Sequence, residues 1–232
     1  MKKLGIIGAM TVEVETLKEQ LSDLKVTERA GMEFYEGVLA GCPAVVVQCG
    51  VGKVNAAMCV QILCDLFCVT HIVNTGVAGS LCAELDIGDF VISTDAMYHD
   101  FSVTPLGYQV GQVPGLQTHS FPADSQLVSM AMAAAQQVHP DHARMGRIAS
   151  GDQFVAAKEQ KKQIIADTQA LCTEMEGAAI AHTAWRNGVP FVVIRAISDK
   201  ADDSAEMDYP TFEAIAAKRC AAVTQNLAAA LA

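Results

Sequence analysis

Short, almost continuous apolar runs alternate along the chain with longer segments in which apolar residues recur every three or four positions. The continuous runs are typical of strands buried on both faces, and the longer segments are typical of amphipathic helices. Strands are expected at residues 4–9, 44–49, 71–74, 90–93, 147–149, 171–173 and 191–196. Helices are expected at residues 11–21, 52–67, 125–138, 157–167, 176–187 and 211–231. This alternation predicts an α/β fold with a central sheet flanked by helices.

The region from residue 32 to residue 49 has a different pattern. Residues 32–39 lead into residues 43–49 through a short, hairpin-like connection. Strands joined by so short a connection run antiparallel, so the central sheet is expected to be mixed. Because no linker, repeat or low-complexity tract interrupts the chain, residues 1–232 are interpreted as a single domain.

Residues 101–123 form the longest stretch without a periodic pattern. The stretch holds three prolines and three glycines spaced among apolar residues, and no Lys, Arg, Asp or Glu. It exceeds the roughly 12–15 residues beyond which a structureless loop is usually functional or disordered. Its apolar side chains argue against disorder. We therefore expect a loop that lies on an apolar ligand, a partner subunit or both.

The composition narrows the class of protein. Of the 232 residues, 51% are hydrophobic and only 18% are charged, which excludes a disordered chain. The formal net charge of −10 would repel phosphate backbones, which argues against a general nucleic-acid binder. The apolar run at residues 4–10 is too short for a signal peptide, and polar residues such as His71 and Asn74 interrupt residues 66–83. Neither a secretion signal nor a membrane span is expected.

The cysteines and histidines indicate neither a disulfide framework nor a metal centre. None of the eight cysteines forms a Cys-x-x-Cys motif, and most lie in apolar stretches. They are interpreted as buried, reduced thiols of a cytoplasmic protein. His139 and His142 share a short loop but have no further ligands nearby in sequence. No metal and no organic cofactor is expected.

Glycine-rich segments follow three of the expected strands. Gly8 precedes a helix that carries Glu13, and residues 50–56 and 75–80 follow the next two strands. Ligands of open α/β sheets bind beyond the carboxyl ends of the strands, and glycine lets the backbone approach them closely. Neither a Gly-x-Gly-x-x-Gly fingerprint nor a complete Walker A motif is present. The alternatives are tight turns that pack helices onto the sheet and, for Glu13, a solvated residue in the first turn of a helix.

Two carboxylates stand two residues apart after the strand at 171–173. Alternation sends Glu174 and Glu176 to the same side of an extended segment, with Met175 on the other side. A carboxylate can accept hydrogen bonds from both adjacent hydroxyls of a ribose. The alternative interpretation is a pair of acids that cap the following helix.

The last expected strand is wholly apolar and delivers three polar residues to its carboxyl end, Arg195, Ser198 and Asp199. Desolvation at such a position raises the pKa of an aspartate, which would suit a general acid. The alternative interpretation is a helix-capping Asp199 in a salt bridge with Arg195.

Taken together, seven motifs in this order resemble those of one family. They are Gly8-Ala9-Met10 with Glu13, Gly50-Val51-Gly52-Lys53-Val54-Asn55-Ala56, Asn74-Thr75-Gly76-Val77-Ala78-Gly79, Tyr98-His99-Asp100, Ser150-Gly151-Asp152-Gln153-Phe154, Glu174-Met175-Glu176 and Arg195-Ala196-Ile197-Ser198-Asp199. The chain is similar from its first strand to its last helix to the 5′-methylthioadenosine/S-adenosylhomocysteine nucleosidases of the nucleoside phosphorylase superfamily. The resemblance implies a nucleoside phosphorylase-like fold and hydrolysis of the N-glycosidic bond of a 5′-thio-substituted adenosine.

The same resemblance implies roles for the catalytic residues. Asp199 would protonate N7 of adenine, and Ser198 would orient it. Glu13, helped by Arg195, would hold and deprotonate the attacking water. Glu176 would bind the ribose hydroxyls near the positive charge that develops on the sugar.

The substrate-binding residues are carried over in the same way. Phe154 would stack on adenine, the backbone of Val155 would read its edge, Met175 would lie under the ribose and Met10 would line the thio pocket. The remaining residues expected to line the same site are Val77, Ala78, Gly79, Glu174 and Tyr209.

Members of this family are homodimers, so the resemblance also gives the uncharged loop a meaning. Val103, Leu106, Tyr108 and Pro114 match positions that line the alkylthio pocket from the partner subunit. Tyr209 and Phe212 match a mobile segment that closes over the nucleoside. The chain departs from the family at three positions, where Val77 replaces a frequent Ser, Leu106 a common aromatic residue and Tyr209 a common Phe. We expect these departures to alter substrate preference rather than the type of reaction.

Other functions stay open at this point. A purine nucleoside phosphorylase would use phosphate, but only five arginines are present and Glu13 would stand where phosphate binds. A futalosine-type nucleosidase would share nearly every motif. A non-catalytic nucleoside-binding protein would not need Glu13, Glu176 and Asp199 together. A structural or interaction module has no supporting segment such as a coiled coil.

Overall fold

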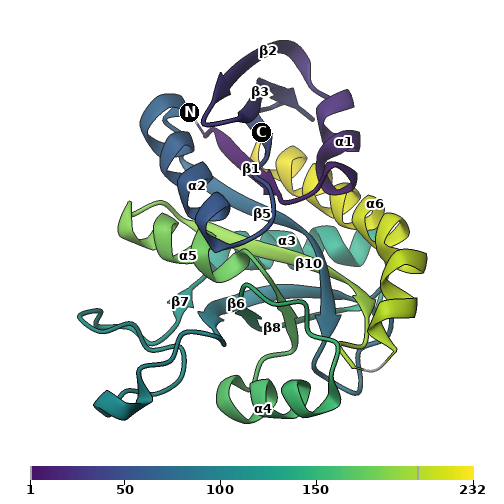
Figure 1. Ribbon diagram of the computed structural model, residues 1–232. Coiled ribbons are helices and arrows are strands. Elements are labelled where there is room, and N and C mark those ends of the chain that lie inside the picture. The colour runs from purple at the N-terminus through teal and green to yellow at the C-terminus, as the bar shows by residue number, and fades with distance from the viewer. Residues whose placement is uncertain (1, 203) are drawn as a thin grey trace.

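The computed structural model describes residues 2–202 and 204–232 (Figure 1). The strands are β1 (Leu4–Gly8), β2 (Ser22–Arg29), β3 (Met32–Leu39), β4 (Cys42–Gln48), β5 (His71–Ser80), β6 (Phe90–Tyr98), β7 (Phe121–Pro122), β8 (Ala143–Ser150), β9 (Cys172–Glu174) and β10 (Phe191–Asp199). The α-helices are α1 (Thr11–Glu19), α2 (Lys53–Phe67), α3 (Ser125–Val138), α4 (Lys158–Thr168), α5 (Gly177–Arg186) and α6 (Ala205–Leu231). A single 3₁₀ turn, η1 (Thr104–Leu106), lies between β6 and β7.

All of these strands belong to one mixed sheet. The order is β10-β6-β8-β9-β5-β1-β4-β3-β2, and β7 pairs with β6. Because β10 also pairs with β5, the five strands β5, β10, β6, β8 and β9 close on themselves like a small barrel. Strands β1, β4, β3 and β2 extend this barrel as an open sheet. The expected mixed α/β architecture is confirmed.

Helices cover both faces of the sheet, and each face has its own apolar core. Helices α2 and α5 pack together over one face, where their buried residues join one large cluster (Figure 1). Helices α1, α3 and α6 enclose a second cluster on the other face. Small and aliphatic side chains fill both cores, which agrees with the low aromatic content of 6%.

The expected strands and helices are all present, but several extend beyond the residues whose pattern predicts them. Strand β5 continues to Ser80 and β10 to Asp199, because residues 76–79 pair with residues 195–199. The glycine-rich segment expected to follow this strand after residue 74 is therefore part of the strand. Helix α6 begins at Ala205 and runs through Pro210, although a proline inside a helix removes one backbone hydrogen bond.

Strand β2 was not expected, and its sequence explains why. Its side chains are almost all exposed, because it forms the edge of the sheet and pairs only with β3. Such a strand lacks the apolar periodicity that identifies buried strands. The expected hairpin at residues 32–49 is confirmed as the antiparallel pair β3 and β4.

The pairing also decides where polar side chains meet. Strands β1, β4, β5 and β10 run parallel to their neighbours in this group, so their carboxyl ends lie at the same edge of the sheet. Strand β9 runs antiparallel to β5 and pairs with its end, which brings Thr173 opposite Gly79. Residues from five separate parts of the chain therefore converge at one edge.

Two leucines of α2 provide a test of the packing. Leu63 is completely buried, and Leu66, one turn further on, is 55% exposed. We expect Leu63→Ala to lower the free energy of unfolding by about 2–5 kcal/mol, because it leaves a cavity in the core. Leu66→Ala, the matched control, should change it by about 0.5 kcal/mol or less. Urea unfolding of both variants measures the difference, and equal losses would contradict the described burial of α2.

Candidate active site

A pocket opens at the edge of the sheet where the carboxyl ends of β1, β5 and β10 meet. Its walls also include β9 and the segments that follow β4 and β8, and Tyr209 of α6 closes one side. Phe212 of α6 does not line the pocket, but every other residue that the sequence analysis places in this chain's own site does. These residues are Met10, Glu13, Val77, Ala78, Gly79, Phe154, Val155, Glu174, Met175, Glu176, Arg195, Ser198, Asp199 and Tyr209.

Four further residues line the pocket and were missed. They are Ala9, Val51, Gln153 and Thr173. Each lies within, or directly next to, a segment that the sequence analysis identified. The signal was therefore present, but only the folded chain shows which side of each segment faces the pocket.

Arg195 is the central charge of the site. Its side chain is 1% exposed and stands among three buried carboxylates. Its Nη2 atom forms an ion pair with Glu174 and donates to Asn74 Oδ1 at 2.5 Å. Its guanidinium lies 3.8 Å from Glu13 Oε1 and 3.7 Å from Glu176 Oε2. Burial alone would lower the pKa of Arg195, but the three carboxylates outweigh burial and raise it.

Glu174 is held by four donors. The Ser150 hydroxyl donates to Oε1, and Oε2 accepts from Arg195 and from the backbone N–H groups of Glu176 (3.1 Å) and Gly177 (2.8 Å). The two N–H groups belong to the start of α5, where a carboxylate is favoured. The capping interpretation therefore describes this carboxylate better than a free acceptor for ribose hydroxyls.

Glu176 has a different environment although it lies only two residues away. Its Oε1 accepts a hydrogen bond of 2.8 Å from the backbone N–H of Gly52, just before α2. Burial raises the pKa of Glu176 from 4.5 to about 7, and repulsion from Glu174 adds to the shift, while Arg195 opposes it. The second oxygen makes no hydrogen bond to the residues that the structure describes, so it can accept one from a ligand.

Glu13 is buried, which rules out a solvated residue in the first turn of α1. It is 2% exposed and accepts three backbone hydrogen bonds, from Ala9 (2.7 Å), Met10 (3.0 Å) and Val77 (3.0 Å). Burial raises the pKa of Glu13, and the charge of Arg195 and these N–H groups oppose the shift. The carboxyl group of Glu13 is thus buried and held in one orientation.

Asp199 lies at the end of β10 and is 3% exposed. Its Oδ2 accepts from the Ser198 hydroxyl at 2.9 Å, and its Oδ1 accepts from the Ala201 N–H at 2.8 Å. Burial raises the pKa of Asp199. The alternative of a salt bridge with Arg195 does not occur among the ion pairs of residues 2–202 and 204–232. A buried carboxyl that retains its proton can donate it to a ligand.

Two glycines of β5 leave the space that these carboxylates occupy. A Cβ atom at Gly76 would overlap with Glu13 and Arg195. A Cβ atom at Gly79 would lie 2.8 Å from Asp199 Oδ1. The close approach of strand and carboxylate therefore requires glycine at both positions.

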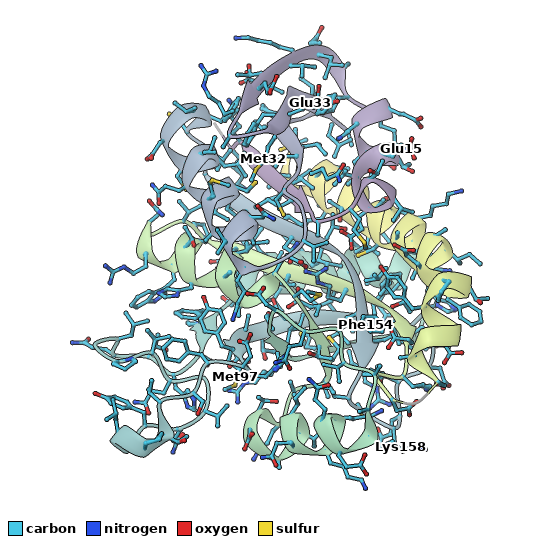
Figure 2. All side chains as sticks on the ribbon, in the orientation of Figure 1. Glu15, Met32, Glu33, Met97, Phe154 and Lys158 are labelled. Atoms are coloured by element: carbon cyan, nitrogen blue, oxygen red, sulfur yellow. The ribbon has the colours of Figure 1, made fainter. Side chains whose placement is uncertain are left out.

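Two aromatic rings form the outer wall of the pocket. Phe154, on the segment between β8 and α4, lies beside α6 (Figure 2). Its ring centroid is 5.5 Å from that of Tyr209, with the planes 79° apart. The Tyr209 hydroxyl lies 3.2 Å from the Sδ atom of Met10, the residue that directly precedes α1. Phe154 is 49% exposed, so one face is available to a flat ligand.

The four residues expected to act across a dimer do not line the pocket of their own chain. Val103, Leu106, Tyr108 and Pro114 lie on the teal segment that projects from the body between β6 and β7 (Figure 1). Leu106 is 73% exposed. Their expected role needs a second copy of the chain and stays a prediction.

Neither a metal centre nor a membrane-spanning helix occurs in the described part of the chain. Across residues 2–202 and 204–232, no group of three His, Cys, Asp or Glu side chains is arranged to hold a metal ion. No helix in the described part of the chain combines the length and the apolar character that a membrane span needs.

Known proteins resemble this chain in sequence and in fold. The family model of the phosphorylase superfamily matches residues 3–229. A 5′-methylthioadenosine/S-adenosylhomocysteine nucleosidase of Exiguobacterium sp. is 39% identical over 230 residues, which cover 97% of this chain and 98% of the relative.

Solved structures agree with these relatives. The nucleosidase of Neisseria meningitidis in complex with methylthio-immucillin-A superposes with a TM-score of 0.95 at 37% identity, covering 99% of this chain and 100% of that one. A futalosine hydrolase of Helicobacter pylori superposes with a TM-score of 0.92 at 31% identity, covering 97% of each chain. The expected nucleoside phosphorylase-like fold is confirmed, and the chain belongs to the 5′-methylthioadenosine/S-adenosylhomocysteine nucleosidase family of the phosphorylase superfamily.

Proposed function

We propose that this protein hydrolyses the N-glycosidic bond of 5′-methylthioadenosine and S-adenosylhomocysteine, releasing adenine and the 5-thio-substituted ribose. Family membership supports this reaction, and one feature of the pocket carries it. A buried carboxyl suited to protonate a leaving base, Asp199, shares the pocket with a buried carboxylate suited to accept a proton from water, Glu13. Hydrolysis needs both groups at once.

The leaving group is the adenine base. Asp199 donates its proton to N7, so that the base leaves as a neutral molecule, and Ser198 holds the aspartate in place. Burial raises the pKa of Asp199, which favours the protonated form that a general acid needs. Phe154 stacks on the purine, and the backbone of the buried Val155 contacts its edge.

The nucleophile is a water molecule bound between Glu13 and Arg195. Burial raises the pKa of Glu13, which makes its carboxylate a better proton acceptor than a solvated one. Three backbone N–H groups fix its orientation, so no reorganisation is needed at the moment of attack.

The sugar develops positive charge as the bond to adenine breaks. Glu176 binds the ribose hydroxyls through Oε2, the carboxylate oxygen that is not hydrogen-bonded to Gly52, and Met175 lies under the ribose ring. Three carboxylates surround the one cation Arg195, so the site has more negative than positive charge. A cationic transition state reduces this imbalance, and the site therefore stabilises it more than the neutral substrate.

The 5′ substituent of the bound nucleoside lies against Met10 and Tyr209 and extends from there towards a second subunit. We propose a homodimer in which the loop of each copy completes the pocket of the other, with residues 1–232 acting as one catalytic domain. Exposed apolar side chains on α2 and α5 support a partner on this side of the molecule: Val54, Met58 and Trp185. The residues proposed to line the partner's alkylthio pocket are Val103, Leu106, Tyr108 and Pro114.

We place the reaction in the cytoplasm, in nucleoside catabolism and methionine salvage. All eight cysteines are free thiols, and five of them are buried. Free thiols are typical of proteins from a reducing compartment.

The two alternative reactions have less support. A phosphorylase needs a cationic site for phosphate, but the pocket has one arginine, already surrounded by Glu13, Glu174 and Glu176. A futalosine-type nucleosidase is not favoured, because the methylthioadenosine/S-adenosylhomocysteine nucleosidases of Exiguobacterium sp. and Neisseria meningitidis are 39% and 37% identical to this chain, against 31% for the futalosine hydrolase.

The acid is tested by Asp199→Asn. We expect kcat for methylthioadenosine to fall by about 10²–10⁴-fold, because the amide cannot donate a proton to N7. The dissociation constant should change little, since the pocket keeps its shape. Asp141→Asn, in an exposed turn with a φ of 64° that asparagine tolerates, is the matched control. Undiminished turnover of Asp199→Asn would remove this residue as the acid.

The nucleophile is tested by measuring adenine release in phosphate-free buffer and again with phosphate added. We expect the same rate in both, because water is the proposed nucleophile and the acidic pocket repels phosphate. Release that depends on phosphate would make the protein a phosphorylase and remove the proposed role of Glu13.

The raised pKa of Glu176 predicts opposite effects of pH on activity and on stability. Only the ionised form serves as proposed, so kcat/KM should fall as the pH drops through about 7. The native carboxyl binds a proton more tightly than the unfolded one. Its contribution to the free energy of unfolding is therefore full below pH 4.5 and is lost as the pH rises through about 7. Rate measurements and urea unfolding across this range test both; activity and stability that fall together below pH 7 would contradict the assignment.

A further inference from the structure

The outer wall of the pocket includes a polar pair whose function the proposed reaction leaves unassigned. The Tyr209 hydroxyl donates to Glu213 Oε1 at 2.9 Å. The same hydroxyl lies 3.2 Å from Met10 Sδ, and both Tyr209 and Met10 line the pocket. The carboxylate of Glu213 is thus one hydrogen bond away from the part of the pocket proposed to hold the 5′ substituent.

The geometry of α6 fixes this pair. Tyr209 and Glu213 are four residues apart, so both side chains lie on the same face of the helix. Burial raises the pKa of Tyr209, and its hydrogen bond to Glu213 raises it further, so the hydroxyl retains its proton and remains a donor. Glu213 does not itself line the pocket, but its hydrogen bond to Tyr209 holds it in one place next to the rim that Tyr209 forms.

Among the residues that the structure describes, Glu213 has no positively charged ion-pair partner. No lysine, arginine or histidine forms an ion pair with it within residues 2–202 and 204–232. The charged groups that raise the pKa of Tyr209 are Glu213, Glu13 and Asp199, all of them acids. The rim next to Met10 therefore attracts a cationic ligand group and repels an anionic one.

We infer that Glu213, held by Tyr209, favours nucleosides whose 5′ substituent carries an ammonium group. This inference rests on the proposed function. S-Adenosylhomocysteine bears an ammonium on its 5′ side chain, and methylthioadenosine bears only a methyl group at the same sulfur. An ammonium has three donors and can reach the carboxylate while it lies against the aromatic ring of Tyr209.

The carboxylate that S-adenosylhomocysteine also carries would be repelled by the same rim. The clearest probe is therefore 5′-deoxy-5′-(3-aminopropylthio)adenosine, which has the ammonium without the carboxylate. Its kcat/KM relative to that of methylthioadenosine reports the contribution of the charge alone.

The experiment compares this ratio in the wild-type protein, in Glu213→Gln and in Glu159→Gln. The first variant keeps an acceptor for Tyr209 but removes the charge. The second removes one exposed charge in the first turn of α4, so the net charge of the two variants is matched. We expect Glu213→Gln to lower the ratio by about two- to fivefold, as for a partly solvated ion pair, and Glu159→Gln to leave it unchanged. Added salt should lower the wild-type ratio towards that of Glu213→Gln.

The outcomes separate the inference from the function on which it rests. Turnover of methylthioadenosine by the wild-type protein, with the same ratio in all three proteins, would overturn the role of Glu213 and leave the proposed hydrolysis intact. Failure of the wild-type protein to hydrolyse either nucleoside would overturn the proposed function and this inference with it. Because methylthioadenosine is measured in every preparation, a misfolded variant loses both activities and is recognised.

Discussion

One buried cation among three buried carboxylates is the interaction on which the site depends. Arg195 pairs with Glu174 and faces Glu13 and Glu176, and all four side chains are nearly inaccessible to solvent. One positive charge cannot neutralise three negative ones. Burial raises the pKa values of Glu13 and Glu176, and for Glu176 repulsion from Glu174 and Glu13 adds to the shift. The same imbalance favours a ligand that becomes positively charged, so an arrangement that is costly for the empty pocket is useful in the reaction.

The fold holds these carboxylates in place through hydrogen bonds from backbone N–H groups. Glu13 accepts hydrogen bonds from the N–H of Ala9, which follows β1, and from the N–H of Val77 in β5. Glu176 accepts one from the N–H of Gly52, which precedes α2. Glu174 ties the start of α5 to Arg195 of β10. Each carboxylate therefore connects elements that are distant in sequence, and the parallel strands that place their carboxyl ends at one edge make those connections possible.

The sequence predicted the strands and helices whose buried side chains produce an apolar pattern, and it did not predict those that lack such a pattern. The continuous apolar runs identified β1, β4 and β10, and the helical periodicity identified α3 at its observed bounds. The exposed edge strand β2 has no such pattern and was missed. Residues 75–80 were expected to follow the strand, either as backbone that lies against a ligand or as a tight strand exit. They continue the strand instead, and the glycines at 76 and 79 make room for Glu13 and Asp199.

The sequence by itself determined the α/β class, the mixed sheet, the family and most of the side chains that line the pocket. These properties follow from local patterns and ordered motifs, which the chain carries whether or not it is folded. The tertiary structure alone decided how the acids are distributed. Glu174 and Glu176 are two residues apart, yet one is saturated by the start of α5 and by Arg195 and the other keeps an oxygen for a ligand. Hydrogen bonding and burial depend on which strands meet, and no local pattern encodes that meeting.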